Sequence, residues 1–296
     1  MKRQHDSAAV NSDMIRRPIQ RWSPLFLLPV VAAFAIGFVW PFFHGLFLSF
    51  CNFKTTSNWK WVGLENYVKA FSDESFMYSF GFTALFAVVS LVLINVFAFA
   101  VAYALTQKIK GANIFRTVFF MPNLIGGIVL GYIWSMIFDG VLSNYGKSIL
   151  TDSTWGFWGL IILMCWQQIG YMMIIYIAGL QNVPPDLLEA ASIDGATPIQ
   201  QLIKVKIPMV MSSITICLFL TLSNGFKLFD QNLALTAGDP AHSTEMLALN
   251  IYQTFYSRAG MQWKGYGQAK AVLFCILVVV ISFAQLRATR SKEVQR

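Results

Sequence analysis

The chain has 296 residues, of which 56% are hydrophobic and only 12% are charged, and its mean hydropathy is +0.56. Soluble domains carry about 25% charged residues, so this composition excludes an ordinary soluble fold and indicates that much of the surface faces a bilayer. The formal net charge is +8. The basic residues sit at the ends of apolar runs and not in a stripe, which is typical of a membrane protein and argues against nucleic-acid binding.

Six apolar segments are long enough to cross about 30 Å of hydrocarbon as helices of about 20 residues. The sequence therefore predicts an all-α membrane protein with a basic N-terminal segment (1–24), a six-helix transmembrane domain (25–287) and a short tail (288–296). The first apolar run is too long for a signal peptide and lacks a clear cleavage site, so we expect it to be retained. The predicted spans are 25–50, 77–106, 118–138, 157–180, 208–230 and 270–287.

Six spans place both termini on the same side of the membrane. That side carries 14 Lys and Arg residues against 7 on the other, with Lys227 inside a span. The side richer in Lys and Arg is normally cytoplasmic. The sequence therefore predicts cytoplasmic termini, a cytoplasmic 181–207 loop and an external 231–269 segment, with the inverted topology as the alternative.

The loop between the fourth and fifth spans reads as two short helices. Pro185 suits the first position of a helix, and Asp186 complements its positive N-terminus. Gly195 tolerates the left-handed conformation that ends helices. Thr197 and Gln200 then form a capping-box pattern for the second helix. Apolar residues recur along one face of each helix, so these faces either pack on the protein's own surface or dock into a groove on a partner.

The same loop resembles the EAA motif of binding-protein-dependent ABC importer permeases. The resemblance rests on several residue types at fixed offsets: Glu189-Ala190-Ala191, Asp194-Gly195-Ala196 and Ile207-Pro208. In that family the loop sits in a cleft of an ATP-hydrolysing subunit. The resemblance implies that Glu189, Ala190, Ala191, Asp194, Gly195 and Pro208 couple this chain to an ATPase, with Glu189 as the polar contact and Gly195 as the turn.

The resemblance covers nearly the whole chain and points to carbohydrate uptake of the maltose-permease type. Its further segments include 61–67, 115–122 and 226–245. It implies the type I ABC importer permease fold in a bacterial cytoplasmic membrane. It also implies four kinds of partner: a second homologous permease, two ATPase subunits that bind ATP and Mg, an extracytoplasmic sugar-binding protein, and the sugar itself.

Polar groups inside a bilayer usually face a cavity or another helix. In the outer part of the fifth span, Asn224, Lys227 and Gln231 fall at i, i+3 and i+7, which places them on one helical face. We expect them to line a sugar pathway, with Asp230 as a further polar group and Phe229 stacking on a sugar ring. The alternative is that Lys227 snorkels to the outer surface and pairs with Asp230.

The third and fourth spans offer further polar and aromatic candidates for this pathway. They include Asn123 and Tyr132 in the third span, and Gln167 and Gln168 in the fourth. Aromatic residues at such positions more often anchor a helix at the interface or pack between helices.

Sequence motifs for catalysis are missing. The chain has no G-x-x-x-x-G-K-[ST] phosphate loop, and its three histidines and four cysteines form no metal-binding pattern. We therefore expect no directly bound cofactor or metal, and no ATP hydrolysis by this chain. A secondary transporter or channel is the main alternative, and an intramembrane enzyme is the third possibility; both need membrane-embedded acids or catalytic sets that the sequence does not offer.

Overall fold

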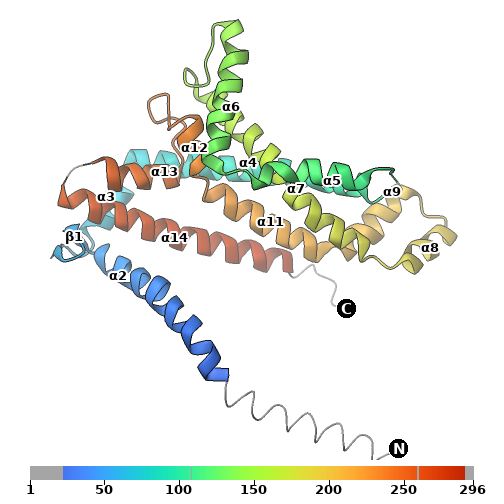
Figure 1. The fold of residues 1–296 in the computed structure, drawn as a ribbon, viewed down its shortest axis with the longest axis horizontal. Coiled ribbons are helices and arrows are strands. Elements are labelled where there is room, and N and C mark those ends of the chain that lie inside the picture. Colours follow the sequence, from blue (N-terminus) through green and yellow to red (C-terminus); the bar gives the residue numbers. More distant parts are fainter. Residues whose placement is uncertain (1–22, 108, 259, 291–296) are drawn as a thin grey trace, which may run out of the picture.

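The computed structural model describes residues 23–107, 109–258 and 260–290 as an elongated helical bundle (Figure 1). The predicted basic segment and most of the predicted tail lie outside the described residues. In chain order the elements are the first helix Ser23–Leu48, which includes η1 (Ala35–Val39) and α2 (Trp40–Leu48), β1 (Cys51–Thr55), β2 (Asn58–Trp61), α3 (Glu65–Phe71), α4 (Glu74–Leu105), α5 (Ala112–Phe120), η2 (Met121–Leu124), α6 (Gly127–Leu142), η3 (Ser143–Tyr145), α7 (Ser153–Gln181), α8 (Pro185–Ile193), α9 (Pro198–Gln201), η4 (Leu202–Lys206), α10 (Ile207–Met209), α11 (Met211–Phe226), α12 (Asp230–Leu235), α13 (Leu247–Tyr252), η5 (Gln253–Ser257) and α14 (Met261–Arg290).

Five described helices are long and apolar enough to cross a membrane, and a bent helix pair supplies the sixth span. The five are Ser23–Leu48, Glu74–Leu105, Gly127–Tyr145, Ser153–Gln181 and Met261–Thr289. The sixth joins Pro198–Met209 to Met211–Phe226 across a bend of 71°. The prediction of six spans is therefore confirmed.

Two of the predicted spans are not continuous helices. The predicted third span, 118–138, breaks between α5 and α6, where Pro122 lies in a 3-10 turn and Gly126 is extended. Proline lacks the N–H that a helix needs, which explains the break. The predicted fifth span, 208–230, bends at Val210 and ends at Phe226. The sixth begins at Met261, earlier than the predicted residue 270.

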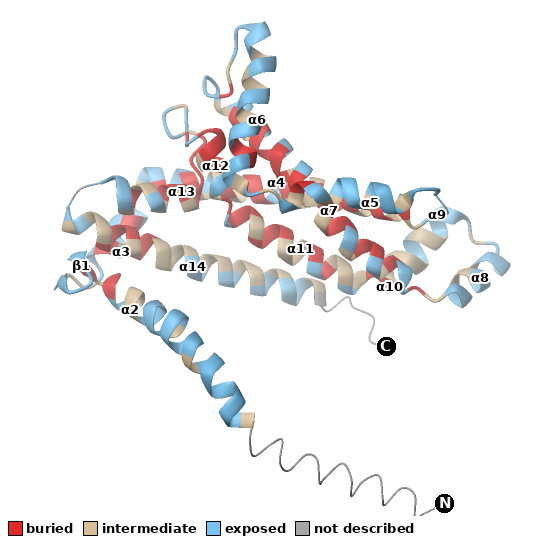
Figure 2. Cartoon of the chain, viewed as in Figure 1, coloured by how far each residue is buried: buried red, intermediate tan, exposed pale blue. Residues whose placement is uncertain are grey.

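The buried core lies where α4, α7 and α11 pack together, it continues toward α13 and the start of α14, and burial falls off toward α8 and α9 (Figure 2). A polar chain joins the three helices at this level. The Tyr176 hydroxyl donates to Asn95 Oδ1 at 2.7 Å, and Asn95 Nδ2 donates to Thr221 Oγ1 at 3.2 Å. Hydrogen bonds between helices are a usual source of cohesion in membrane bundles, where apolar packing alone gives little preference over lipid.

Two helices stand away from this core (Figures 1 and 2). The first helix projects from the bundle, and 0% of its most apolar window is buried. Helix α6 rests on α12 through a glycine notch: a Cβ on Gly131 would lie 2.5 Å from the Cβ of Ala234. Small residues four apart let two helices approach closely, and Gly127 is the other member of this pair. The remaining apolar faces of both helices are exposed.

Candidate functional site

The loop between α7 and α11 has the local structure that its sequence predicts. Helix α8 begins with Pro185 in its first turn, and Gly195 follows it with a φ of +78°. The predicted capping box is present: Gln200 N donates to Thr197 Oγ1 at 3.3 Å, and Thr197 N donates to Gln200 Oε1 at 2.8 Å. These contacts satisfy backbone groups that a short helix otherwise leaves without partners.

The two short helices are joined into one unit. Gln201 Nε2 donates to Ser192 Oγ at 2.9 Å and to the Ala196 carbonyl at 3.3 Å. The turn itself is closed by Ala196 N, which donates to the Ala191 carbonyl at 2.9 Å. These hydrogen bonds hold the two short helices in one arrangement relative to each other.

The outer surface of this unit is exposed and partly apolar. Within the described residues, α8 and α9 contain no buried residue. Ile193 is 86% exposed and Ile199 is 69% exposed, and the carboxylate of Glu189 is in solvent beside them. Leu188, Ala191 and Gln201 are half-buried, and Leu188 packs against the chain's own core. Most of the apolar surface is thus left uncovered by the described part of the chain, which favours docking on a partner.

Pro208 lies in α10, next to the break in the bent span at Val210. A cavity of about 470 Å³ opens beside this break, between α7 and the start of α11, and Pro208, Gly179 and Ser213 are among its lining residues. The 71° bend turns the loop unit away from the axis of α11.

Several polar side chains meet where α7 faces α11 and α12. Gln231 Nε2 donates to Gln167 Oε1 at 2.7 Å, and Asn224 Nδ2 donates to Gln168 Oε1 at 3.3 Å. Gln167 Nε2 in turn donates to the Ile125 carbonyl at 3.2 Å, in the break between α5 and α6. A side chain of α7 therefore forms a hydrogen bond with a backbone carbonyl at the break between α5 and α6. Irregular backbone at membrane depth requires such partners for its polar groups.

The predicted common face of Asn224, Lys227 and Gln231 is wrong. Helix α11 ends at Phe226 and α12 begins at Asp230, so the helical spacing does not hold across Lys227. Asn224 and Gln231 both contact α7, whereas Lys227 lines a separate cavity of about 350 Å³ with α14 residues such as Ser282. The structure records no ion pair between Lys227 and Asp230 among the described residues.

The other predicted pathway residues are dispersed around this region. Phe229 contacts Tyr252 with ring centroids 5.1 Å apart, on the side facing α13 and α14. Asp230 is exposed beside Gly127, and Tyr132 is 61% exposed on α6. Asn123 is half-buried in the turn η2. The structure therefore brings Asn224 and Gln231 together with α7, and leaves Phe229 and Tyr132 apart from them.

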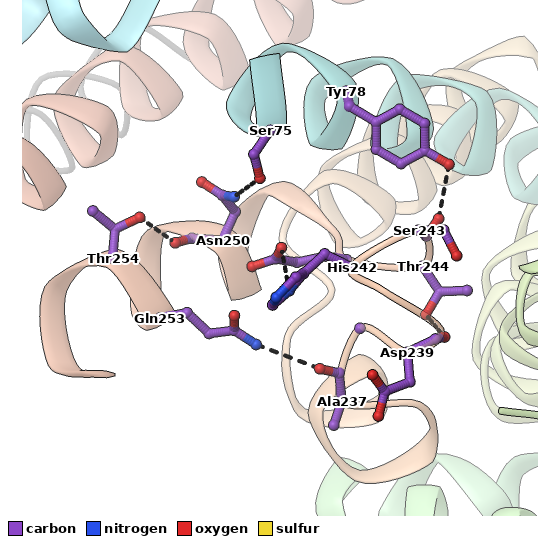
Figure 3. Close-up of polar contacts among 12 residues, drawn as sticks. Ser75, Tyr78, Ala237, Asp239, His242, Ser243, Thr244, Asn250, Gln253 and Thr254 are labelled. Carbon is purple, nitrogen blue, oxygen red and sulfur yellow. Dashed lines mark hydrogen bonds and ion pairs between the residues drawn. The ribbon is translucent and has the colours of Figure 1, made fainter. Parts of the chain in front are cut away.

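The loop that follows α12 is tied to α4 and to η5 by hydrogen bonds (Figure 3). The Tyr78 hydroxyl donates to the Ser243 carbonyl at 3.0 Å, and Gln253 Nε2 donates to the Ala237 carbonyl at 3.4 Å. The buried Glu245 places its Oε2 atom 3.1 Å from Nδ1 of the exposed His242. Burial raises the pKa of the Glu245 carboxyl above its ordinary value.

An ion pair joins the buried Lys270 to the half-buried Asp73, and sequence reasoning did not predict it. Lys270, 1% exposed, donates to Asp73 Oδ2 at 2.8 Å, to Asn250 Oδ1 at 2.9 Å and to Thr254 Oγ1 at 3.1 Å. Asp73 also caps α4 by accepting from the backbone of Ser75. One carboxylate therefore ties the start of α4 to α14.

These features define a polytopic helical membrane protein with an exposed two-helix loop on one side and a rigid polar cap on the other. A family model described as "Binding-protein-dependent transport system inner membrane component" matches residues 110–292. The chain is 43% identical over 282 residues to the probable starch degradation products transport system permease protein AmyD of Thermoanaerobacterium thermosulfurigenes, covering 93% of this chain and 96% of that protein.

Two further matches extend this result. The chain is 32% identical over 291 residues to the multiple sugar-binding transport system permease protein MsmF of Streptococcus mutans, covering 95% of this chain and 99% of that protein. A crystal structure of a bacterial ABC transporter that imports alginate matches with a TM-score of 0.78 and 20% identity, over 94% of this chain and 99% of that chain.

The chain belongs to the family of binding-protein-dependent transport system inner membrane components. It is an integral membrane transport component and not an enzyme, and its fold is that of an ABC importer permease, as the sequence predicts.

Proposed function

We propose that this chain is the permease subunit of an ATP-driven sugar importer, coupled to partner ATPases through α8 and α9. The names of the two relatives described above refer to starch degradation products and to multiple sugars. Maltose and short maltooligosaccharides are therefore the first substrates to test. ATP and Mg bind on the partner ATPases in this proposal, and this chain binds neither.

The observation that carries the proposal is the exposed, internally braced unit of α8 and α9. An apolar side chain such as Ile193, 86% exposed beside the charged Glu189, suits a contact with another protein better than one with water. In this proposal Glu189, Ala190, Ala191, Asp194 and Gly195 face an ATPase subunit. Movement of that subunit reaches α11 through the bend at Pro208.

The exposed apolar faces of the first helix and of α6 support a second permease as the next partner. The first helix and α6 expose apolar faces away from the core, and lipid or a neighbouring permease must cover them. A homologous subunit would complete a translocation pathway between the two chains. Its walls on this side would include Asn224, Gln231 and the two glutamines of α7, with Asp230, Asn123 and Tyr132 nearer its edges.

The same proposal fixes the orientation. The loop of α8 and α9 lies in the cytoplasm with both termini, and the cap over Lys270 faces outward in the cytoplasmic membrane of a bacterium. An extracytoplasmic sugar-binding protein would then approach the external loop 236–246. The alginate importer is described in complex with a periplasmic protein bound to an alginate pentasaccharide, which supports this type of partner.

The proposal is tested by measuring maltooligosaccharide uptake and sugar-stimulated ATP hydrolysis in the intact transporter. We expect Glu189→Lys to lower both by about tenfold or more, the equivalent of about 1.4 kcal/mol of lost coupling, while the chain still inserts in the membrane. Glu74→Lys is the control, because Glu74 is also an exposed carboxylate and lies at the start of α4, away from α8 and α9. If the Glu189→Lys variant transports sugar normally, Glu189 has no role in coupling to the ATPase.

A further inference from the structure

Helix α3 (Glu65–Phe71) divides its surface into three sectors. One sector packs on the protein: Ala70 and Asn66 are buried, and Asn66 Nδ2 donates to the carbonyls of Ser49 and Cys51, each at 3.2 Å. A second sector is charged, where Lys69 Nζ lies 2.7 Å from Glu65 Oε1. This pair stands in solvent and joins successive turns of the helix.

The third sector is apolar and uncovered. Leu64, which precedes the helix, and Val68 and Phe71 within it recur at helical spacing on one face. They are 64%, 64% and 63% exposed. A face of this kind is unusual beside water on a helix that already uses another face for packing. The charged sector of α3 faces solvent, and the apolar sector beside it faces outward, away from the bundle.

The position of α3 along the bundle gives its depth in the membrane. It lies level with the start of α14, because the Tyr266 hydroxyl donates to the Lys69 carbonyl at 3.5 Å. Tyr266 and Arg287 are 21 residues apart in the same helix, which is about 31 Å at about 1.5 Å per residue. The hydrocarbon core is about 30 Å thick. With Arg287 at one boundary of this core, α3 lies at the opposite boundary.

The preceding strand β2 (Asn58–Trp61) adds aromatic anchors at the same level. Trp59 and Trp61 alternate with Lys60 along the strand and remain 46% and 56% exposed. Phe47, at the outer end of the exposed first helix, contacts both indoles, with ring centroids at 5.1 and 5.9 Å. The aromatic cluster is therefore continuous with a transmembrane helix. Tryptophan is enriched at membrane interfaces, because its ring is apolar and its N–H is polar.

We propose that β2 and α3, residues 58–71, form an interfacial segment that lies in the outer leaflet of the bilayer. Leu64, Val68 and Phe71 face the acyl chains, and the Glu65–Lys69 edge faces water. Two observations favour lipid over a protein partner: the depth of α3, and the continuity of the aromatic cluster with the exposed first helix. Because Asp73 caps α4 directly after this segment, the segment sets the depth of the outer ends of α4 and α14.

The test places one cysteine at Val68 or at Lys69 in a chain whose four native cysteines are replaced. The two positions are adjacent and both are exposed, but they lie in different sectors, so each is the matched control for the other. The intact transporter is labelled with a nitroxide and reconstituted in vesicles of phosphatidylethanolamine and phosphatidylglycerol. Collisions with oxygen, which concentrates in lipid, and with a water-soluble nickel chelate are then measured by electron paramagnetic resonance.

We expect the ratio of oxygen to nickel collisions to be roughly threefold or more higher at position 68 than at position 69, because an interfacial helix buries its apolar face at the boundary between headgroups and acyl chains. Equal ratios at the two positions would overturn the proposal, since both side chains would then face water. Protection of position 68 from both reagents would also overturn it, since another subunit would then cover this face. The fluorescence emission spectrum of Trp59 and Trp61 supplies a second measurement. A chain in which both are replaced by Phe gives the background from the other tryptophans. An emission spectrum that does not change when the transporter is moved from detergent to vesicles contradicts the proposal.

Discussion

Gln201 Nε2 donates to Ser192 Oγ at 2.9 Å and so joins the two short helices that lie between α7 and α11. Neither helix is long enough to be stable alone in water. Their stability as a unit depends on this bond, on the capping box at Thr197 and on the left-handed turn at Gly195. We infer that these contacts maintain the shape that an ATPase subunit recognises.

The turn between α8 and α9 gives the first prediction. Gly195→Val introduces a β-branched residue at a φ of +78°, a conformation that costs an L-residue about 1–2 kcal/mol. Space is not the reason, because an added Cβ meets nothing within 4 Å. We expect the variant to insert normally and to lose most sugar-stimulated ATP hydrolysis. Gly195→Asn is the control, since asparagine tolerates this conformation; equal activity of the two variants contradicts the explanation.

The contact between α6 and α12 gives the second prediction. A Cβ on Gly131 would meet Ala234 Cβ at 2.5 Å, whereas one on Gly140 of the same helix meets nothing within 4 Å. Overpacking costs about 1–3 kcal/mol, so Gly131→Leu should lower the thermal unfolding midpoint of the purified transporter while Gly140→Leu leaves it unchanged. Equal midpoints for the two variants would show that α6 does not depend on this notch.

The amides that link α7 to α11 and α12 give the third prediction. We expect Asn224→Ala and Gln231→Ala to raise the KM for maltooligosaccharide uptake by about threefold to tenfold, which corresponds to one lost hydrogen bond of about 1 kcal/mol. Lys227→Ala is the comparison, because Lys227 lines the cavity on the α14 side. Uptake kinetics in vesicles separate the two cases: a larger effect at Lys227 would move the pathway to the other side of α11.

The fourth prediction concerns acid stability. Burial tends to raise the pKa of Asp73, but hydrogen bonds from Lys270 and Tyr266 outweigh it and hold this pKa below its usual value. Asp73 therefore contributes stability above its unfolded pKa of about 3.9, and this contribution disappears as pH falls through the lower folded value.

Asp73→Asn should accordingly lower the unfolding midpoint at pH 7 by about 3–8 °C, and the difference from the unmodified chain should shrink below about pH 4. Glu65→Gln is the control, because the Glu65–Lys69 pair is exposed and exposed pairs contribute little. A difference that persists unchanged at pH 3 would show that the Asp73 charge is not its cause.

Local rules predict the structure of the loop that contains α8 and α9. Pro185, Gly195 and the Thr197–Gln200 pair each act within a few residues, so their effect on the backbone can be inferred without knowing the rest of the fold. The six spans are predictable for a similar reason, since length and hydropathy decide whether a helix can cross a bilayer.

The contacts that the sequence did not predict depend on distant residues. In the sequence, Lys270 is only a charged residue at the start of a predicted span. The fold shows that Asp73, 197 residues away, forms an ion pair with it. The end of α11 at Phe226 is similarly hidden, because the glutamines of α7 that accept hydrogen bonds from Asn224 and Gln231 lie far away along the chain. Assigning Asn224 and Lys227 to one face failed for this reason.

The central claim is that α8 and α9 dock on an ATPase subunit from inside the cell. A cysteine at Ile193, the most exposed apolar residue of this unit, tests it when the intact transporter is treated with a short thiol-to-amine cross-linker and the products are identified by mass spectrometry. We expect a cross-link to an ATP-hydrolysing subunit, and none from a cysteine placed at the exposed Ser143 beyond α6. A cysteine at position 193 that forms no such cross-link, or that reacts with a membrane-impermeant reagent added outside intact cells, would contradict the account.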